Sequence, residues 1–207
     1  MSDSRQEIRI CFIGESFVNG TGDPEFLGWT GRVCRNTESE KYAITYYNLG
    51  VRAETSRYLK ERWRSEVSYR LPVEYDGRVV FSFGVNDSGW AGQKQGITLA
   101  ESIANTRSIL KQANQLYPTL MVGPPPCGDE DQETKNQIIA KLSQEFACVC
   151  QDITVPYLDV FSSLVNSPVW LIEAKANDGA HPKANGYAEF AALVQNWEGW
   201  LNWFPTE

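Results

Sequence analysis

Short apolar runs alternate with longer amphipathic segments along this chain of 207 residues. Five of the runs have the length and the content of branched and aromatic residues that mark mostly buried strands. We expect these strands at Ile8–Ile13, Ala43–Leu49, Arg78–Phe83, Thr119–Val122 and Val155–Val160.

The segments between these strands place apolar residues at helical spacing. We expect helices over residues 53–71, 98–116 and 129–149, and a last helix from about residue 183. Thr98 and Glu101 form a capping-box signature at the start of the second helix, and Pro118 ends it. The expected apolar stripes of the other three helices consist of Tyr58, Leu59, Trp63, Val67 and Leu71; of Ile138, Ile139, Leu142, Phe146 and Val149; and of Tyr187, Phe190, Val194, Trp197 and Leu201.

Strands that alternate with helices predict an α/β fold in which helices cover both faces of a parallel sheet. Ligands bind such sheets at the carboxyl ends of the strands. Ser16, Gly50 and Asn86 each follow one of the first three strands, and Asp178 and His181 precede the last helix. We therefore expect these residues, which are far apart in sequence, at one edge of the sheet.

The composition predicts a globular chain that forms a single domain over residues 1–207. Hydrophobic residues make up 42% and charged residues 22%, which is ordinary for globular proteins. No apolar run reaches the roughly 20 residues that a membrane helix needs, so we expect no stable membrane insertion. The polar first residues do not resemble an export signal, and we expect a cytoplasmic protein.

The net charge argues about nucleic-acid partners, and the cysteines argue about metal ions. Nineteen basic and 26 acidic residues give a net charge of -7, which argues against nucleic acid as a partner. The basic run Arg57–Arg64 is interrupted by Glu61, and we interpret it as a solvated helix face. We interpret the five cysteines as reduced thiols and expect no metal site, because Cys148 and Cys150 are too close for a zinc-type pair and no histidine neighbours them. The oligomeric state stays open.

The single histidine of the chain, His181, limits imidazole chemistry to one candidate. Asp178 precedes it by three residues, so both side chains can emerge on one side of a tight loop. The carboxylate could accept from one ring nitrogen and leave the other facing Ser16. We therefore hypothesise that Ser16 attacks as a nucleophile, His181 accepts its proton and Asp178 orients His181.

Three neutral donors near the same edge could bind an oxyanion: the backbone amides of Ser16 and Gly50 and the side chain of Asn86. Each residue taken alone also has a structural interpretation, namely a helix cap for Ser16 and turn formation for Gly50 and Asn86. Their occurrence in order at successive strand ends favours the functional interpretation.

Three more residues are weaker candidates for contacts with substrate. Glu15 and Asp87 flank the expected site and could tune its charge, or they could be solvated surface groups. Trp90 lies in the glycine-rich segment 88–96, which could line a substrate cleft or form a surface loop.

These residues resemble the signature of the SGNH hydrolases, which are also called GDSL esterases and lipases. The four letters of that name match Ser16, Gly50, Asn86 and His181. The first motif is GESF at 14–17, where the family more often has GDSL. Both replacements keep the chemical type, so they bear on substrate preference more than on reactivity. The resemblance extends from about residue 8 into the last helix.

The resemblance implies a three-layer α/β/α, flavodoxin-like sandwich with a five-stranded parallel sheet. It also implies ester hydrolysis without a metal or an organic cofactor, and a small-molecule ester as substrate. Ser16, His181 and Asp178 would form the catalytic triad, and Ser16, Gly50 and Asn86 the oxyanion hole. Acyl esters, thioesters, lysophospholipids and acetylated sugars all stay open as substrates.

Two other interpretations stay open at this stage. An α/β-hydrolase has the same order of serine, acid and histidine, but its elbow motif requires a second glycine where this chain has Val18. A non-catalytic, flavodoxin-like module could use the same loops to bind a small ligand or a glycan. The chain has neither of the glycine-rich phosphate-binding motifs, so such a module would not be a typical nucleotide binder.

Overall fold

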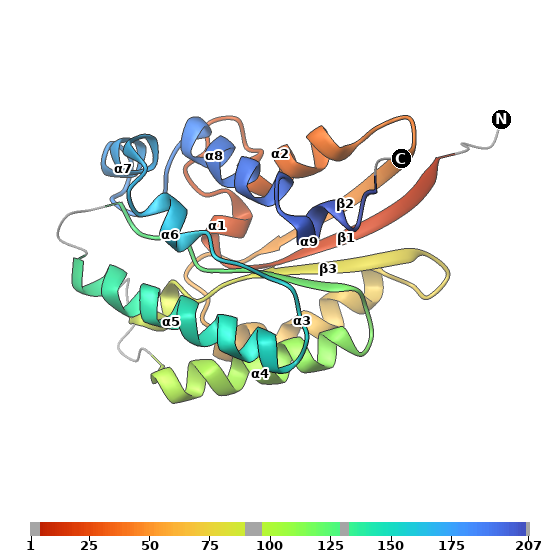
Figure 1. The fold of residues 1–207 in the computed structure, drawn as a ribbon, viewed down its shortest axis with the longest axis horizontal. Helices are drawn as coiled ribbons and strands as arrows, with labels where there is room; N and C mark the ends of the chain where they lie inside the picture. Colours follow the sequence, from red (N-terminus) through yellow and green to blue (C-terminus); the bar gives the residue numbers. More distant parts are fainter. Residues whose placement is uncertain (1–4, 90–96, 129–132, 206–207) are drawn as a thin grey trace.

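A parallel sheet forms the centre of the molecule (Figure 1). The structure is a computed structural model, and it describes residues 5–89, 97–128 and 133–205. Within them the sheet has five strands in the order β2-β1-β3-β4-β5, and every neighbouring pair is parallel. The strands are β1 (Gln6–Gly14), β2 (Tyr42–Gly50), β3 (Asp76–Ser82), β4 (Thr119–Val122) and β5 (Tyr157–Leu158).

Helices cover both faces of the sheet, so the predicted three-layer α/β/α fold is confirmed. In Figure 1, α3, α4 and α5 lie below the sheet, and α1, α2, α8 and α9 lie above it. The helices are α1 (Ser16–Asn19), α2 (Gly28–Thr37), α3 (Ser56–Arg70), α4 (Leu99–Asn114), α5 (Glu133–Asp152), α6 (Phe161–Leu164), α7 (Pro168–Lys175), α8 (Ala184–Gln195) and α9 (Glu198–Leu201), and a 3-10 turn, η1, spans Asn86–Ser88.

The strand order reverses beside Ser16. The chain leaves β1 toward β2 on one side and later returns to β3 on the other side, so the order reverses between β1 and β3. Adjacent strands whose connections run in opposite directions leave a crevice at their carboxyl ends, where α/β proteins bind ligands. Ser16 follows β1 and Asn86 follows β3, so two of the predicted site residues flank this point.

Most of the elements predicted from sequence are confirmed. The first four strands are present at the expected places, whereas only residues 157 and 158 of the expected fifth strand pair with β4. The side chain of Thr98 accepts a hydrogen bond from the Glu101 amide at 3.2 Å, as the capping box predicts. Helices α2, α6 and α7 were not predicted.

Three residues of the predicted apolar stripes are exposed. Tyr58, Ile138 and Leu201 are 55%, 43% and 48% exposed, so their assignment to the core was wrong. For Leu201 the reason is a break: α8 ends at Gln195, and the chain restarts as α9. This break turns Trp200 inward instead, and Trp200 is 2% exposed.

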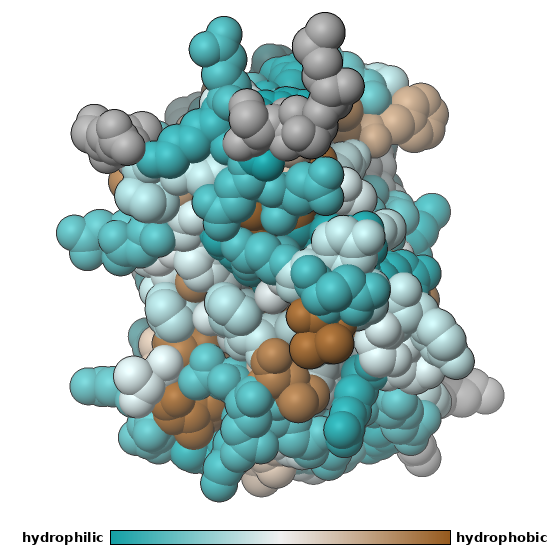
Figure 2. Space-filling model, turned by 90° about the vertical axis from the view of Figure 1, so that its right-hand side faces the viewer, coloured by the Kyte–Doolittle hydropathy of each residue, from teal (hydrophilic) through white to brown (hydrophobic). Residues whose placement is uncertain are grey.

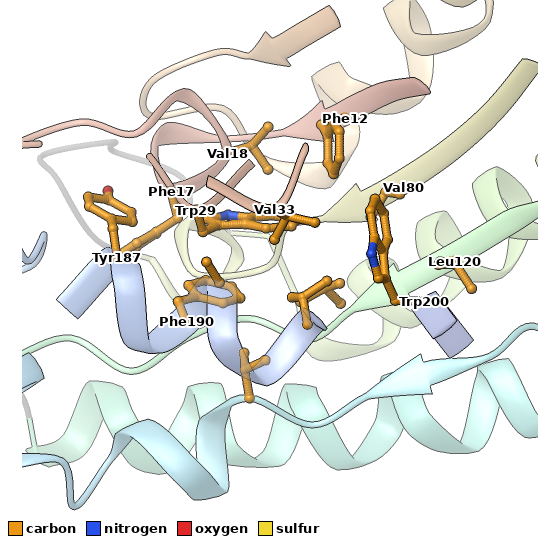
Figure 3. Packing of buried hydrophobic residues seen from close by; sticks show 14 of the residues in the cluster. Phe12, Phe17, Val18, Trp29, Val33, Val80, Leu120, Tyr187, Phe190 and Trp200 are labelled. Atoms are coloured by element: carbon orange, nitrogen blue, oxygen red, sulfur yellow. The ribbon is translucent and has the colours of Figure 1, made fainter. Parts of the chain in front are cut away.

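Alternate residues of β1 build two cores, one on each side of the sheet. Ile8, Ile10 and Phe12 face the layer of α2 and α8, and Cys11 and Ile13 face the layer of α3 and α4. Figure 3 shows the first core, which is rich in aromatic rings. The rings of Trp29 and Phe190 stack there with centroids 4.9 Å apart, which joins α2 to α8.

The end of the sheet at which the strands begin is seen face-on in Figure 2. Its surface is mostly hydrophilic and carries small, separate hydrophobic patches. Val73 and Leu116 are exposed in the loops that lead into β3 and β4 at this end. The predicted catalytic residues lie at the other end, beyond the carboxyl ends of the strands.

Candidate active site

Ser16 begins the short helix α1 directly after β1. Its carbonyl accepts hydrogen bonds from the amides of Gly20 and Thr21, both at 3.0 Å, so this turn is closed on itself. The residue is only 5% exposed. Ser16 is therefore almost completely buried beyond the carboxyl end of β1, at the edge of the sheet where the sequence predicts it.

The imidazole of His181 contacts both of its predicted partners. Its Nε2 lies 2.7 Å from Ser16 Oγ, and its Nδ1 lies 2.8 Å from Asp178 Oδ2. Because a carboxylate only accepts, Nδ1 carries the proton, which leaves the lone pair of Nε2 toward the serine hydroxyl. The three groups thus lie in the order that proton transfer from Ser16 requires.

The loop before α8 holds this pair in place through its own backbone. Oδ1 of Asp178 accepts from the amides of Ala180 at 3.1 Å and His181 at 2.8 Å, so the loop folds around the carboxylate. The side chain of Asn177 donates to the His181 carbonyl at 3.0 Å. Glu173, on α7, accepts from the first amides of α8 and fixes where that helix begins.

An aromatic pair lies against the imidazole. The centroid of the Phe17 ring is 4.6 Å from that of His181, at an interplanar angle of 39°. Trp170 stacks behind Phe17 at 6.0 Å and donates its indole N–H to the Pro126 carbonyl at 3.1 Å. Phe17 occupies the position at which the family more often has leucine, and its contact with His181 could not be predicted from the sequence.

Burial and charge keep the imidazole neutral. Burial lowers the pKa of His181 below its usual 6.5, the Asp178 carboxylate opposes this shift, and the cations of Arg52 and Lys135 add to it. Burial alone would raise the pKa of Asp178, but hydrogen bonds from the backbone and ring of His181 hold that pKa below its usual value. Near neutral pH the pair is therefore an ionised carboxylate beside a neutral base, which suits general-base chemistry.

Gly50 and Asn86 lie at the same edge, and each already has partners. Gly50 is the register partner of Gly14, two residues before Ser16, and its amide donates to Oδ1 of Asn48 at 3.0 Å. A Cβ at position 50 would lie 2.3 Å from the Asn19 amide nitrogen, so only glycine fits there. Nδ2 of Asn86 donates to the Glu54 carbonyl at 3.0 Å and to Oε2 of Glu15.

Glu15 is a buried structural group and not the solvated surface group that the sequence left open as an alternative. The residue is 1% exposed, and its carboxylate accepts from the amides of Val85 at 3.0 Å and Asn86 at 3.2 Å. Burial, together with the nearby charge of Asp87, raises the pKa of Glu15 to about 8. Its side chain holds the turn after β3 rather than facing the solvent.

Asp87 is also a buried structural group, so the alternative of a solvated surface group is wrong here too, and a contact with substrate stays a prediction. It is 4% exposed and accepts from the Ser56 amide at 2.8 Å and the Ser102 hydroxyl at 2.5 Å, which links η1 to α3 and α4. Both carboxylates resembled surface groups in the sequence because their partners come from distant segments. Trp90, the third weak candidate, lies outside the described residues.

We searched the described residues for a metal site and for paired cysteines. Within it, no group of three or more histidine, cysteine, aspartate or glutamate side chains is arranged to hold a metal ion. All five cysteines lie within it and are free thiols, and Cys148 is the exposed one. None of its helices combines the length and apolar composition needed to cross a membrane.

Comparison with known families finds one match across this site. The family model described as the GDSL-like lipase/acylhydrolase family matches residues 12–189. This span contains every residue of the candidate site, from Ser16 to His181. No curated protein matches the sequence.

Solved structures with the same fold include esterases. An acetylxylan esterase from Geobacillus stearothermophilus superposes with a TM-score of 0.75 over 100% of this chain and 98% of that chain, at 18% identity. A lipase/acylhydrolase from Enterococcus faecalis superposes with a TM-score of 0.68 over 90% of this chain and 93% of that chain, at 21% identity. At these identities the similarity shows a shared fold.

Proposed function

Because the chain belongs to the GDSL-like lipase/acylhydrolase family and is a carboxylic ester hydrolase, we propose that it works through an acyl-enzyme on Ser16. The observation that carries this proposal is the contact of 2.7 Å between Ser16 Oγ and His181 Nε2, with Asp178 at 2.8 Å on the other side of the ring. The span of the family match supports treating the chain as one catalytic domain.

The first half-reaction acylates the serine. His181 Nε2 removes the hydroxyl proton as Ser16 Oγ bonds to the carbonyl carbon, and Asp178 stabilises the imidazolium that forms. The negative charge moves to the carbonyl oxygen. When the tetrahedral intermediate collapses, His181 gives the proton to the departing alcohol oxygen, and the acyl group stays on Ser16.

The second half-reaction uses water in the place of the alcohol. His181 removes a proton from water, the oxygen attacks the acyl carbon, and the proton returns to Ser16 Oγ as the acid leaves. In both halves the oxyanion would receive hydrogen bonds from the Ser16 and Gly50 amides and from Asn86. The oxyanion then competes with Oδ1 of Asn48 for the Gly50 amide and with the Glu54 carbonyl for the Asn86 side chain.

For the substrate we propose a small-molecule ester with a short acyl group. Ser16 and His181 are each only 5% exposed, so a compact acyl group reaches the nucleophile more easily than a long chain. One structural relative is an acetylxylan esterase, which makes an acetyl group on a carbohydrate the first substrate to test.

The test combines labelling of the nucleophile with an ester panel. We expect a fluorophosphonate to add to Ser16, as located by peptide mass spectrometry, and turnover to be highest for acetyl and to decline with acyl length. Ser16→Ala should lose labelling and at least about 10⁴-fold of the activity. Ser65→Ala, which changes an exposed serine on α3, is the matched control. An unlabelled wild-type protein that still binds acetylated sugars would instead indicate a non-catalytic module.

A further inference from the structure

One arginine of the basic run at 57–64 turns toward the active-site edge. The sequence predicted a solvated helix face there, and for Arg62 this prediction is wrong: its side chain is 17% exposed. From α3, its Nη2 reaches the Leu49 carbonyl at 2.9 Å and the Gly14 carbonyl at 3.1 Å. These two residues lie at the carboxyl ends of β2 and β1.

The contact with Leu49 bears directly on a predicted oxyanion donor. The carbonyl of Leu49 and the N–H of Gly50 are the two ends of one planar peptide group. A cation that hydrogen-bonds to the carbonyl fixes the direction of the N–H. It also polarises the group, because hydrogen bonds in a chain strengthen one another. The charge of Arg62 thus acts on the Gly50 amide without touching a substrate.

The contact with Gly14 ties this peptide to the nucleophile. Gly14 and Gly50 are register partners, and the Gly14 carbonyl also accepts from the Val51 amide at 3.0 Å. Arg62 therefore bridges the last residues of the two strands that lead into Ser16 and Gly50. A shift of one strand end against the other would change the distance between nucleophile and donor.

The counter-ion of Arg62 reaches the other predicted donor. Glu54 binds the guanidinium through Nε at 2.7 Å and Nη2 at 2.5 Å, and its own carbonyl accepts from the Asn86 side chain at 3.0 Å. Glu66 is a weaker second counter-ion, with 3.3 Å between Oε1 and Nη1. The guanidinium thus hydrogen-bonds to two strand ends and to the carboxylate of Glu54, whose backbone carbonyl accepts from Asn86.

We propose that Arg62 is a positioning residue for the oxyanion donors. It holds and polarises the Leu49–Gly50 peptide, and it anchors Glu54, whose backbone carbonyl accepts from the Asn86 side chain. The proposal rests on the proposed function of Gly50 and Asn86 as oxyanion donors. Arg62 binds no substrate atom in this role. Its loss should therefore weaken transition-state stabilisation and leave substrate affinity nearly unchanged.

The experiment compares Arg62→Gln and Arg62→Lys with Arg57→Gln, a control on the same helix whose partner is Glu101. We expect Arg62→Gln to lower kcat by about 10- to 100-fold with KM within about twofold, because one donor is weakened rather than removed. Arg62→Lys should be intermediate, since it keeps the charge but lacks the fork. The acid limb of the pH profile, which reports His181, should stay in place.

A second measurement does not depend on turnover. The ¹H–¹⁵N resonance of the Gly50 amide should move upfield in both Arg62 variants and stay in place in Arg57→Gln. An unmoved Gly50 resonance together with wild-type kcat would overturn the proposal. If Arg62→Gln does not fold, Arg62→Lys decides by the same two measurements. If Ser16 is not labelled, the proposed function is overturned. The Gly50 resonance would still show whether Arg62 positions the Leu49–Gly50 peptide.

Discussion

The two halves of the proposed active site are prepared to different degrees. In the proton-transfer half, Ser16, His181 and Asp178 already contact one another at 2.7 and 2.8 Å. In the predicted oxyanion half, the Gly50 amide is bound to Asn48, and the Asn86 side chain is bound to Glu15 and Glu54. One half is ready before substrate arrives, and two of the three donors proposed for the other half are already engaged.

This difference has an energetic meaning. A neutral ester carbonyl competes poorly with the acceptors that already hold Gly50 and Asn86, since it is no better an acceptor than the Glu54 carbonyl. An oxyanion competes well, because hydrogen bonds to a charged acceptor are roughly twice as strong. The donors would then be released mainly as charge develops, so they would favour the transition state over the bound substrate.

The largest effect should come from Asp178→Asn, which tests the half that is ready. The asparagine amide would point an N–H at Nδ1, which forces the proton of the ring onto Nε2 and removes the base. We expect kcat/KM for an aryl acetate to fall by about 10³- to 10⁴-fold, while labelling by fluorophosphonate slows in parallel.

The matched control for this variant is Asp76→Asn, at the other end of the sheet, where the carboxylate pairs with Arg78 at 2.7 Å. It should keep wild-type kcat/KM and lose only some stability. Equal activity losses in the two variants would show that Asp178 acts through folding and not through the imidazole.

Asn86→Ala tests the oxyanion half and should have a smaller effect. The backbone donors of Ser16 and Gly50 remain, and Glu15 keeps its bonds from the amides of residues 85 and 86. We expect kcat to fall by about 10²-fold with little change in KM. Asn105→Ala removes a comparably buried amide on α4 and should leave kcat unchanged. A rise in KM at constant kcat would mean that Asn86 binds the ground state, contrary to the argument above.

The juxtaposition of Ser16, His181 and Asp178 was predictable because simple rules place these residues. Ser16 follows a strand of strong hydrophobic pattern, and the carboxyl-end rule for parallel sheets then brings it to the same edge as His181. The burial of Glu15 and Asp87 was not predictable, because it depends on amides and hydroxyls from β3, α3 and α4. The inward orientation of Arg62 was not predictable either, because every residue has a backbone carbonyl and the sequence does not indicate which carbonyls will accept from a side chain.

The missed helices show a similar limit in the fold. α2 contains Gly28, Thr30 and Gly31, which are weak helix formers, so its sequence does not stand out as a helix although one side of it is apolar. Its Arg32 is paired with Asp23 inside the protein, a contact that only the folded chain reveals. α7 does carry a helix signal in its sequence: Ser167 caps its first turn and Pro168 follows at the first helical position.

Phe17→Leu should have a smaller effect than either change above, and it tests why the imidazole stays neutral. Leucine fills less space, so water can approach the ring and the pKa of His181 should rise toward 6.5. Because only the neutral ring accepts a proton, the acid limb of kcat/KM should move to higher pH, with a loss of about tenfold or less at pH 7. Phe81→Leu, in the core on the other side of the sheet, should destabilise the protein without moving that limb. An unmoved limb in both variants would contradict this explanation.

Glu15→Gln should have the least effect on activity and a distinct effect on stability. Burial and Asp87 raise the pKa of Glu15 from 4.5 to about 8 in the folded protein. Between these values the unfolded chain carries the charge while the folded chain keeps the proton, so the unfolded state gains as the pH rises. We expect the free energy of unfolding of the wild type to fall, relative to that of the variant, as the pH rises from 4.5 through about 8. Urea unfolding at pH 5, 6.5 and 8.5 measures this difference, with the exposed Glu40→Gln as control. A difference that stays constant with pH would mean that Glu15 is already ionised in the folded protein, and the oxyanion half would then hold a permanent negative charge beside Asn86.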